Sequence, residues 1–312
     1  MARIGSTDLE VFPLCLGGNV FGWTADEAQS LKVLDAYHDA GGNFIDTADS
    51  YSAWVPGNSG GESETIIGNW LARRGRRDDL VLATKVSRHP DVRGLSRDSI
   101  RRGAEASLRR LQTDHIDLYY AHYDDPDTPL EETVAALGEL VAEGKVRYLA
   151  ASNFSADRIR ESLKIAEETG VARYVAVQPH YNLVHRGDVE PELAGLAGRE
   201  DLSLIPYYAL ASGFLTGKYR DTDPAGSSSP RSPAALKYLD DRGRRVLAAL
   251  DQVAAGHSSA VATVALSWLL SRPQVVAPIA SARTPQQVPD LIAAADLKLS
   301  TAELDTLTAA SA

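Results

Sequence analysis

Short apolar runs rich in β-branched residues alternate along the chain with longer amphipathic stretches. Eight of these runs have the continuous apolar character of parallel strands that are buried on both faces. The predicted strands are Leu14–Leu16, Phe44–Ala48, Val81–Val86, Ile116–Ala121, Val146–Ala151, Tyr174–Val177, Leu202–Pro206 and Val275–Ile279. An eightfold alternation of strand and helix predicts an α/β protein with a (β/α)8 TIM barrel.

The segments between the strands carry helix-start signals. Thr128-Pro129-Leu130-Glu131 offers an N-cap, a proline at the first helical position and a capping-box glutamate. Thr284-Pro285-Gln286-Gln287 repeats the pattern, and Ser96 and Ser155 are further candidate N-caps. These signals support helices between the predicted strands.

Three features lie outside the repeat. Ile4–Val11, with Ser6-Thr7-Asp8 as its turn, predicts an N-terminal β-hairpin. Long loops follow strand two (Ser52–Glu62) and strand seven (Ala211–Arg242), and Gly226-Ser227-Ser228-Ser229-Pro230 in the second loop is expected to be mobile.

No linker divides the chain, so we expect one domain over residues 1–312. The alternative fold is a doubly wound sheet. It is disfavoured because G-x-G-x-x-G is absent and Gly213–Lys218 misses the P-loop spacing by one residue.

Composition narrows the classes of function. The net charge of −10 argues against a nucleic-acid partner, and the single cysteine, Cys15, excludes a disulfide framework. No apolar run reaches the roughly 18 residues of a membrane span, and Met1–Ser6 lacks a signal-peptide pattern. We therefore expect a cytoplasmic protein with no membrane partner, and a homo-oligomer remains open.

Polar residues gather where the predicted strands end. In a TIM barrel these carboxyl ends face one mouth, where catalytic groups lie. The strand-end residues are Asp46-Thr47-Ala48-Asp49-Ser50-Tyr51, Thr84-Lys85, His122, Ser152-Asn153, Gln178, Tyr207 and Ser281-Ala282-Arg283.

Four of these residues suggest acid chemistry. A phenol is a poor acid at neutral pH, but a nearby ammonium lowers its pKa. Lys85 could supply that ammonium to Tyr51, Asp46 could keep the buried lysine charged, and His122 could orient a carbonyl oxygen. Such a set suits carbonyl reduction by hydride from a nicotinamide.

Each of these residues, taken alone, could also have a purely structural role. Asp46 could cap a helix, Tyr51 could be a half-buried loop residue, and Lys85 could form a structural ion pair. No metal site is expected, because His115, Asp117 and His122 have no evident further ligand.

Taken together, the motifs resemble the aldo-keto reductase superfamily. The resemblance runs from the initial hairpin to about Leu299, in family order. It is carried by Phe44-Ile45-Asp46-Thr47-Ala48-Asp49-Ser50-Tyr51, Ala83-Thr84-Lys85, Asp117-Leu118-Tyr119-Tyr120-Ala121-His122, Ser152-Asn153-Phe154, Gln178-Pro179-His180-Tyr181-Asn182 and Gly213-Phe214-Leu215-Thr216-Gly217-Lys218.

The resemblance implies NADPH-dependent reduction of aldehydes and ketones and a site for NADP(H). Tyr51 would be the general acid, tuned by Lys85 and Asp46, and His122 would orient the substrate. The implied cofactor residues are Gly18 and Asn19 near the nicotinamide, Ser152, Asn153 and Gln178 at its carboxamide, Tyr207 on its ring, Leu210, Gly213, Leu215 and Lys218 at the pyrophosphate, Arg231 as a clasp, and Arg283, Gln287 and Asp290 at the adenosine end.

The chain departs from the family pattern at three positions. Tyr208-Ala209 follows Tyr207 where the family often has Ser-Pro, which removes a hydroxyl contact to phosphate. Leu291 replaces a common adenine-binding asparagine, and Asp290 stands where glutamate is common. These departures affect the adenosine end and leave the four catalytic positions intact.

Two other functions are compatible with parts of this pattern. The potassium-channel β-subunits resemble the chain and share the Gly213–Tyr219 pattern, so a nucleotide-sensing regulatory subunit is the alternative. In that branch asparagine often takes the position of His122, so histidine favours turnover. A barrel aldolase could use Lys85 as a Schiff base, but it gives Asp46 and Tyr51 no role. The small-molecule carbonyl substrate stays undetermined.

Overall fold

Eight parallel strands form one curled sheet in this computed structural model, which describes residues 1–220 and 229–312. The strands are β3 (Cys15–Gly17), β4 (Phe44–Asp46), β5 (Val81–Val86), β8 (Ile116–Ala121), β9 (Val146–Ser152), β10 (Tyr174–Gln178), β11 (Ser203–Leu204) and β12 (Ile279–Ala280). The sheet runs in the order β11-β10-β9-β8-β5-β4-β3-β12. Its ends meet where Val276 N donates to Leu204 O at 3.1 Å and Ile279 N donates to Pro206 O at 2.8 Å. The predicted (β/α)8 barrel is confirmed.

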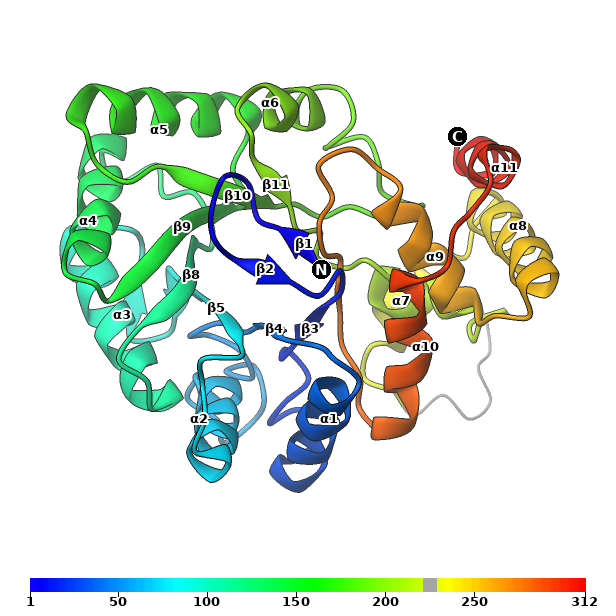
Figure 1. The fold of residues 1–312 in the computed structure, drawn as a ribbon, viewed down its shortest axis with the longest axis horizontal. Coiled ribbons are helices and arrows are strands. Elements are labelled where there is room, and N and C mark those ends of the chain that lie inside the picture. The colour runs from blue at the N-terminus through cyan, green and yellow to red at the C-terminus, as the bar shows by residue number, and fades with distance from the viewer. Residues whose placement is uncertain (221–228) are drawn as a thin grey trace.

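Helices surround the strands (Figure 1). They are α1 (Glu27–Asp39), α2 (Glu62–Arg74), α3 (Arg97–Leu111), α4 (Leu130–Ala142), α5 (Ala156–Thr169), α6 (Leu193–Arg199), α7 (Ser232–Leu236), α8 (Asp241–His257), α9 (Val261–Leu270), α10 (Val288–Ile292) and α11 (Thr301–Ala310), with the 3-10 turns η1 (Ala211–Thr216), η2 (Pro285–Gln287) and η3 (Ala293–Ala295). Ser96 and Ser155 cap α3 and α5, and Thr284 forms a capping box with Gln287, as predicted.

The two-residue period of the strands divides the core into an inner and an outer layer. On β8, Leu118 and Tyr120 belong to the cluster inside the barrel, whereas Tyr119 and Ala121 belong to the cluster between strands and helices. The same period aims Lys85 of β5 inward, at the carboxyl end of its strand. The local pattern of each strand therefore decides which polar side chains reach the barrel interior.

The amino end of the barrel is closed by the predicted hairpin, β1 (Ala2–Arg3) with β2 (Glu10–Val11). The hairpin crosses this end of the ring of strands (Figure 1). Ile4, Leu9 and Val11 are buried and join the cluster inside the barrel. The hairpin thus plugs the end opposite the strand-end polar residues.

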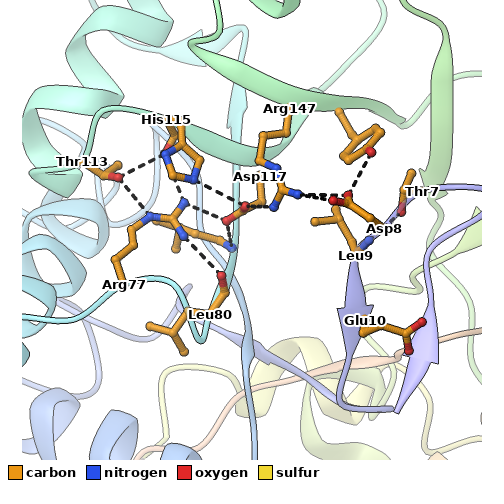
Figure 2. Close-up of polar contacts among 12 residues, drawn as sticks. Thr7, Asp8, Leu9, Glu10, Arg77, Leu80, Thr113, His115, Asp117 and Arg147 are labelled. Atoms are coloured by element: carbon orange, nitrogen blue, oxygen red, sulfur yellow. Dashed lines mark hydrogen bonds and ion pairs between the residues drawn. The ribbon is translucent and has the colours of Figure 1, made fainter.

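A chain of ion pairs fastens the hairpin to the barrel (Figure 2). Asp117, 1% exposed, accepts from Arg77 Nη2 at 2.7 Å, from Leu82 N at 2.8 Å and from Arg147 Nη1 at 2.8 Å. Arg147 Nη2 then donates to both oxygens of Asp8 in the hairpin turn, at 2.9 and 2.8 Å. A buried carboxylate is thereby fully bonded while its outer partners stay partly exposed.

Two local expectations were wrong. Strand eight covers Ile279–Ala280 instead of Val275–Ile279, because Pro278 has no N–H to donate to the ladder. Thr128 does not cap α4, since its hydroxyl donates to Asp125 Oδ2 at 2.7 Å and Pro129 occupies the cap position.

The segment after strand seven is also more regular than a plain loop, because it contains η1 and α7. The expected mobility of the glycine-serine stretch concerns residues 226–228, which lie outside the described residues. Sequence reasoning missed a second hairpin, β6 (Arg88–His89) with β7 (Val92–Arg93).

Within residues 1–220 and 229–312, no single helix is long and apolar enough to cross a membrane. Helices α8 and α9 are long and apolar enough only when taken together, and they are bent by 97° relative to each other. Residues 1–220 and 229–312 also contain no group of three or more His, Cys, Asp or Glu side chains that could hold a metal ion.

Candidate active site

Lys85 lies at the centre of the polar strand ends. Its ammonium donates to Asp46 Oδ2 at 2.6 Å, to the Thr47 carbonyl at 2.7 Å and to the Tyr51 hydroxyl at 2.9 Å. Lys85 is 0% exposed and Asp46 is 1% exposed, so water does not screen the pair. The second oxygen of Asp46 accepts from Gln178 Nε2 at 2.9 Å. Lys85 therefore contacts both Asp46 and Tyr51 directly, and the three residues of the predicted triad lie together.

The Tyr51 phenol is held in its protonated form. Burial raises the pKa of Tyr51 well above its usual range, and the neighbouring Asp46 carboxylate raises it further. The sequence argument expected Lys85 to lower this pKa, and the direction in the structure is the opposite. The reason is that Asp46 accompanies the lysine and burial disfavours the phenolate.

His122 lies beside Tyr51, with 6.2 Å between the two ring centroids. Burial lowers the pKa of His122 well below its usual range, and the charges of Lys85 and Arg88 add to the effect. A neutral imidazole results. Among the described residues, its buried Nδ1 has no hydrogen-bond partner. An unpaired buried nitrogen next to a cavity is a candidate contact for a bound molecule.

The ends of β9, β10 and β11 are joined by a network of side chains. Tyr207 donates its hydroxyl to Asn153 Oδ1 at 2.8 Å, and Asn153 Nδ2 donates to the His122 carbonyl at 2.9 Å. Ser152 Oγ donates to the Gln178 carbonyl at 2.8 Å. Asn153 has a φ of 57°, a conformation that asparagine tolerates better than most residues. The predicted carboxamide residues thus form one connected group.

The segment after β11 has an unusual backbone. Ala211, Ser212 and Gly213 have φ values of 47°, 58° and 94°, and Gly217 has 78°. Left-handed residues in succession turn N–H groups toward one side and form concavities that bind anions. Lys218 Nζ would be 3.3 Å from a Cβ at Gly213, so the cation lies against this turn. Ala211 N and Gly213 N already donate to the carbonyls of Tyr208 and Leu210, so Lys218 is the group of this segment that could meet an anion.

The outer end of the site lies at the start of η2. Arg283 N donates to Gln287 Oε1 at 2.7 Å, which uses the Gln287 carbonyl to fix the turn. Within residues 1–220 and 229–312, Arg283 has no ion pair, and the same holds for Lys218 and Arg231. The Arg231 guanidinium lies 5.7 Å from the centroid of a Trp23 ring.

One cavity of about 820 Å³ connects these groups. Such a volume is within the range of cofactor and ligand sites. The predicted residues in its lining are Asn19, Asp46, Tyr51, His122, Ser152, Asn153, Gln178, Tyr207, Leu210, Gly213, Lys218, Arg231, Arg283, Gln287 and Asp290. Lys85 lies beneath the surface and meets the cavity through Tyr51 and Asp46.

Two predicted cofactor residues do not reach this lining. Leu215 is 0% exposed and packs in the outer core. A Cβ at Gly18 would lie 2.6 Å from Ser63 Oγ of α2, so this glycine is required for packing against the helix. Sequence reasoning also missed one charged residue of the lining, Arg88. Its position two residues after the end of β5 was the available signal.

The barrel and its polar mouth define an oxidoreductase of the aldo/keto reductase family, and the chain belongs to this family. The family model, described as "Aldo/keto reductase family", matches residues 13–312. Members generally bind NAD(P)H.

Three relatives illustrate the range of the family. An uncharacterized oxidoreductase, YrpG of Bacillus subtilis, is 36% identical over 305 residues, which cover 95% of this chain and 91% of the relative. Norsolorinic acid reductase B of Aspergillus parasiticus is 32% identical, and the match covers 97% of this chain and 81% of that relative. A probable voltage-gated potassium channel subunit beta of Oryza sativa is 34% identical, and the match covers 95% of this chain and 90% of that relative.

Proposed function

We propose that the protein reduces an aldehyde or ketone to an alcohol with NADPH as the hydride source. The observation that carries this proposal is the 2.9 Å contact between Lys85 Nζ and the Tyr51 hydroxyl at the wall of a ligand-sized cavity. A protonated phenol beside a buried ammonium can give its proton to a carbonyl oxygen as that oxygen gains negative charge.

Each of the four residues has a distinct part in this proposal. Tyr51 donates the proton, and Lys85 stabilises the phenolate that remains. Asp46 keeps Lys85 charged in its dry environment, since an isolated buried ammonium is strongly disfavoured. His122, which is neutral, can donate a hydrogen bond to the same carbonyl oxygen and fix its position.

The residues present fit a nicotinamide dinucleotide, which when bound would supply the hydride. Ser152, Asn153 and Gln178 offer hydroxyl and amide groups for a carboxamide. Tyr207 offers an aromatic ring on which the nicotinamide could stack. The ring of His180 is stacked against Tyr207, with 5.4 Å between the ring centroids. The left-handed turn at Ser212 is a further observation in favour of this fit.

The cations of the lining suit the phosphates of the same cofactor. The turn over Leu210–Lys218 would meet the pyrophosphate, with Arg231 as a clasp. Arg283, beside the capped start of η2, would meet a 2′-phosphate with its guanidinium fork. This arrangement is the basis for proposing NADPH over NADH. Gln287 and Asp290 would border the adenosine.

A regulatory subunit that binds the cofactor without turnover is the second candidate. The observation in its favour is the similarity to the probable channel subunit of Oryza sativa. Asparagine often takes the position of His122 among the channel subunits that this chain resembles. The histidine and the complete triad favour an enzyme.

The proposal is tested by following the loss of nicotinamide absorbance with a panel of aromatic, aliphatic and sugar-derived carbonyl compounds, with NADPH and NADH in parallel. Turnover of some carbonyl with NADPH supports the reductase. Tight NADPH binding without turnover of any compound would favour the regulatory subunit. Absence of binding would contradict both.

A further inference from the structure

The carbonyl end of the cavity contains a cation that the proposed chemistry does not use. Arg88, the first residue of β6, lines the cavity, and its Cζ lies 4.2 Å from the centroid of the Tyr123 ring. The Tyr123 ring is in turn 5.0 Å from the ring of His122. Arg88 therefore lies about one aromatic ring away from the histidine that would orient the carbonyl.

The guanidinium of Arg88 has no carboxylate partner among residues 1–220 and 229–312. The acidic residues of the lining are Asp46 and Asp290, and Asp46 is already paired with Lys85. Lys218, Arg231 and Arg283 of the same lining also have no ion pair among the described residues, but the proposed cofactor phosphates account for them, whereas nothing in that proposal accounts for Arg88.

The backbone turns sharply to place Arg88. Ser87 has a φ of 122°, which an L side chain rarely adopts, and it is buried. Ser87 O accepts from Gly94 N at 3.0 Å, which closes the β6–β7 hairpin. Strained residues persist where the surrounding structure holds them, and they cluster at ligand sites. The strain here lies one residue before the cation.

The other wall of this end is aromatic. The rings of Trp23 and Trp54 meet edge to face at 5.5 Å, and Trp54 also lies 6.4 Å from Tyr51. Trp54 is 51% exposed, although it is a large apolar side chain. An exposed aromatic wall beside a cavity favours a flat, apolar ligand body.

We propose that Arg88 binds a carboxylate of the substrate, so that the pocket selects aromatic aldehydes or ketones that carry an acid group one ring away from the carbonyl. This inference rests on the proposed reductase function. The guanidinium fork matches a carboxylate in a bidentate manner, and stacking on Tyr123 pre-organises it. Arg88 would be a specificity-determining residue with no part in proton transfer.

The test compares para-carboxybenzaldehyde with para-tolualdehyde, which has the same shape and no charge. The kcat/KM values are measured with NADPH for the wild type, Arg88→Gln and Arg93→Gln. Arg93 pairs with Arg88 across the hairpin and does not line the cavity, so it is the matched control for charge. We expect the kcat/KM of the wild type to be about tenfold higher for para-carboxybenzaldehyde than for para-tolualdehyde. A charge-assisted contact at a partly exposed site contributes about this much to affinity.

Arg88→Gln should lose this preference through a higher KM for the acid, with the neutral aldehyde unaffected. Arg93→Gln should keep the preference, and salt should weaken it in the wild type. Equal loss in both variants would show general charge attraction and overturn the assignment. Equal rates for both aldehydes in the wild type would also overturn it while leaving the reductase intact. No turnover of either aldehyde by the wild type, together with none across the wider carbonyl panel, would instead contradict the proposed function.

Discussion

The hydroxyl of Tyr51 lies 2.9 Å from the ammonium of Lys85. The contact is made by residues 34 positions apart in sequence, because β4 and β5 are neighbours in the barrel and both end at this mouth. The phenol thus meets its cation before any ligand binds, and this pre-organisation is what an acid catalyst needs.

Tyr51→Phe should abolish carbonyl reduction while it leaves cofactor affinity nearly unchanged. The phenol contributes when the oxygen gains charge, so its loss should lower kcat by about 100- to 10,000-fold. Tyr174→Phe is the matched control, because the Tyr174 hydroxyl is buried and Tyr174 is not in the cavity lining. Wild-type turnover by Tyr51→Phe would rule out the phenol as the acid.

The raised pKa of Tyr51 predicts a flat pH profile for reduction. Burial and Asp46 keep the acid protonated through neutral pH, so kcat should stay constant from about pH 7 to about pH 9 and fall only as pH approaches the raised value. Steady-state kinetics across this range, with circular dichroism at each pH to verify folding, provides the measurement. A decline centred near neutrality would indicate that Lys85 outweighs burial.

Asp49 predicts a second pH effect, on stability. It is 1% exposed, and both carboxylate oxygens have no hydrogen-bond partner among the described residues. Burial, followed by the charge of Glu64, raises its pKa to about 8. In the unfolded chain the pKa of an aspartate is about 3.9. Between about pH 4 and pH 8, Asp49 is therefore protonated in the folded state and ionised in the unfolded state, so the free energy of unfolding falls as pH rises through this range.

Asp49→Asn removes the ionisation and should stabilise the protein above about pH 8 by about 5 kcal/mol, with little effect near pH 4. Urea unfolding at several pH values measures the difference. Asp127→Asn, at an exposed loop position, is the control and should change stability little at any pH. A pH-independent effect of Asp49→Asn would argue that the carboxyl is ionised and paired in the native state.

The hairpin network in Figure 2 predicts unequal costs along one chain of ion pairs. Asp117→Asn leaves Arg77 and Arg147 without their buried partner and should cost about 3 kcal/mol. Asp8→Asn removes an exposed partner and should cost less than about 1 kcal/mol. Both are measured by denaturant unfolding. Equal costs would mean that the Asp8–Arg147 pair, not the buried carboxylate, holds the hairpin.

The sequence was informative where a local pattern decides the outcome. The predicted strand ends indicated which polar residues share a mouth, and Lys85 at the end of Val81–Val86 was among them. The cap signals at Ser155 and Thr284 also act within one turn. The C-terminal helix α11 has such a signal too, the Ser300–Glu303 capping box, which sequence reasoning overlooked.

Properties that depend on distant neighbours were not predictable in the same way. The pKa direction of Tyr51 follows from burial, which its local sequence does not encode. Arg88 reaches the cavity through a strained Ser87 and a two-residue strand pair, which is too short for a periodic pattern. Gly18 was assigned to the cofactor, yet its small size serves contact with Ser63 of α2, 45 positions away.

We expect the cofactor preference to depend on Arg283. Its guanidinium has no ion pair within residues 1–220 and 229–312, and it lines the cavity beside the capped start of η2. We expect NADPH to bind more tightly than NADH, because NADH has no 2′-phosphate for this fork. One charged hydrogen-bonded contact is worth roughly 1.5–3 kcal/mol, which is about ten- to a hundredfold in affinity.

Arg283→Ala should therefore bring the two dissociation constants close to parity, chiefly by weakening NADPH. Lys218→Ala is the matched control, because the pyrophosphate is common to both cofactors and both should weaken together. Quenching of tryptophan fluorescence measures the six dissociation constants, those of NADPH and NADH for the wild type and for each variant, and Trp23 lines the same cavity. Leu291, which is buried beside the adenosine end, should lower affinity for both cofactors without changing their ratio. Equal affinity for NADPH and NADH in the unmodified protein would show that Arg283 serves another ligand.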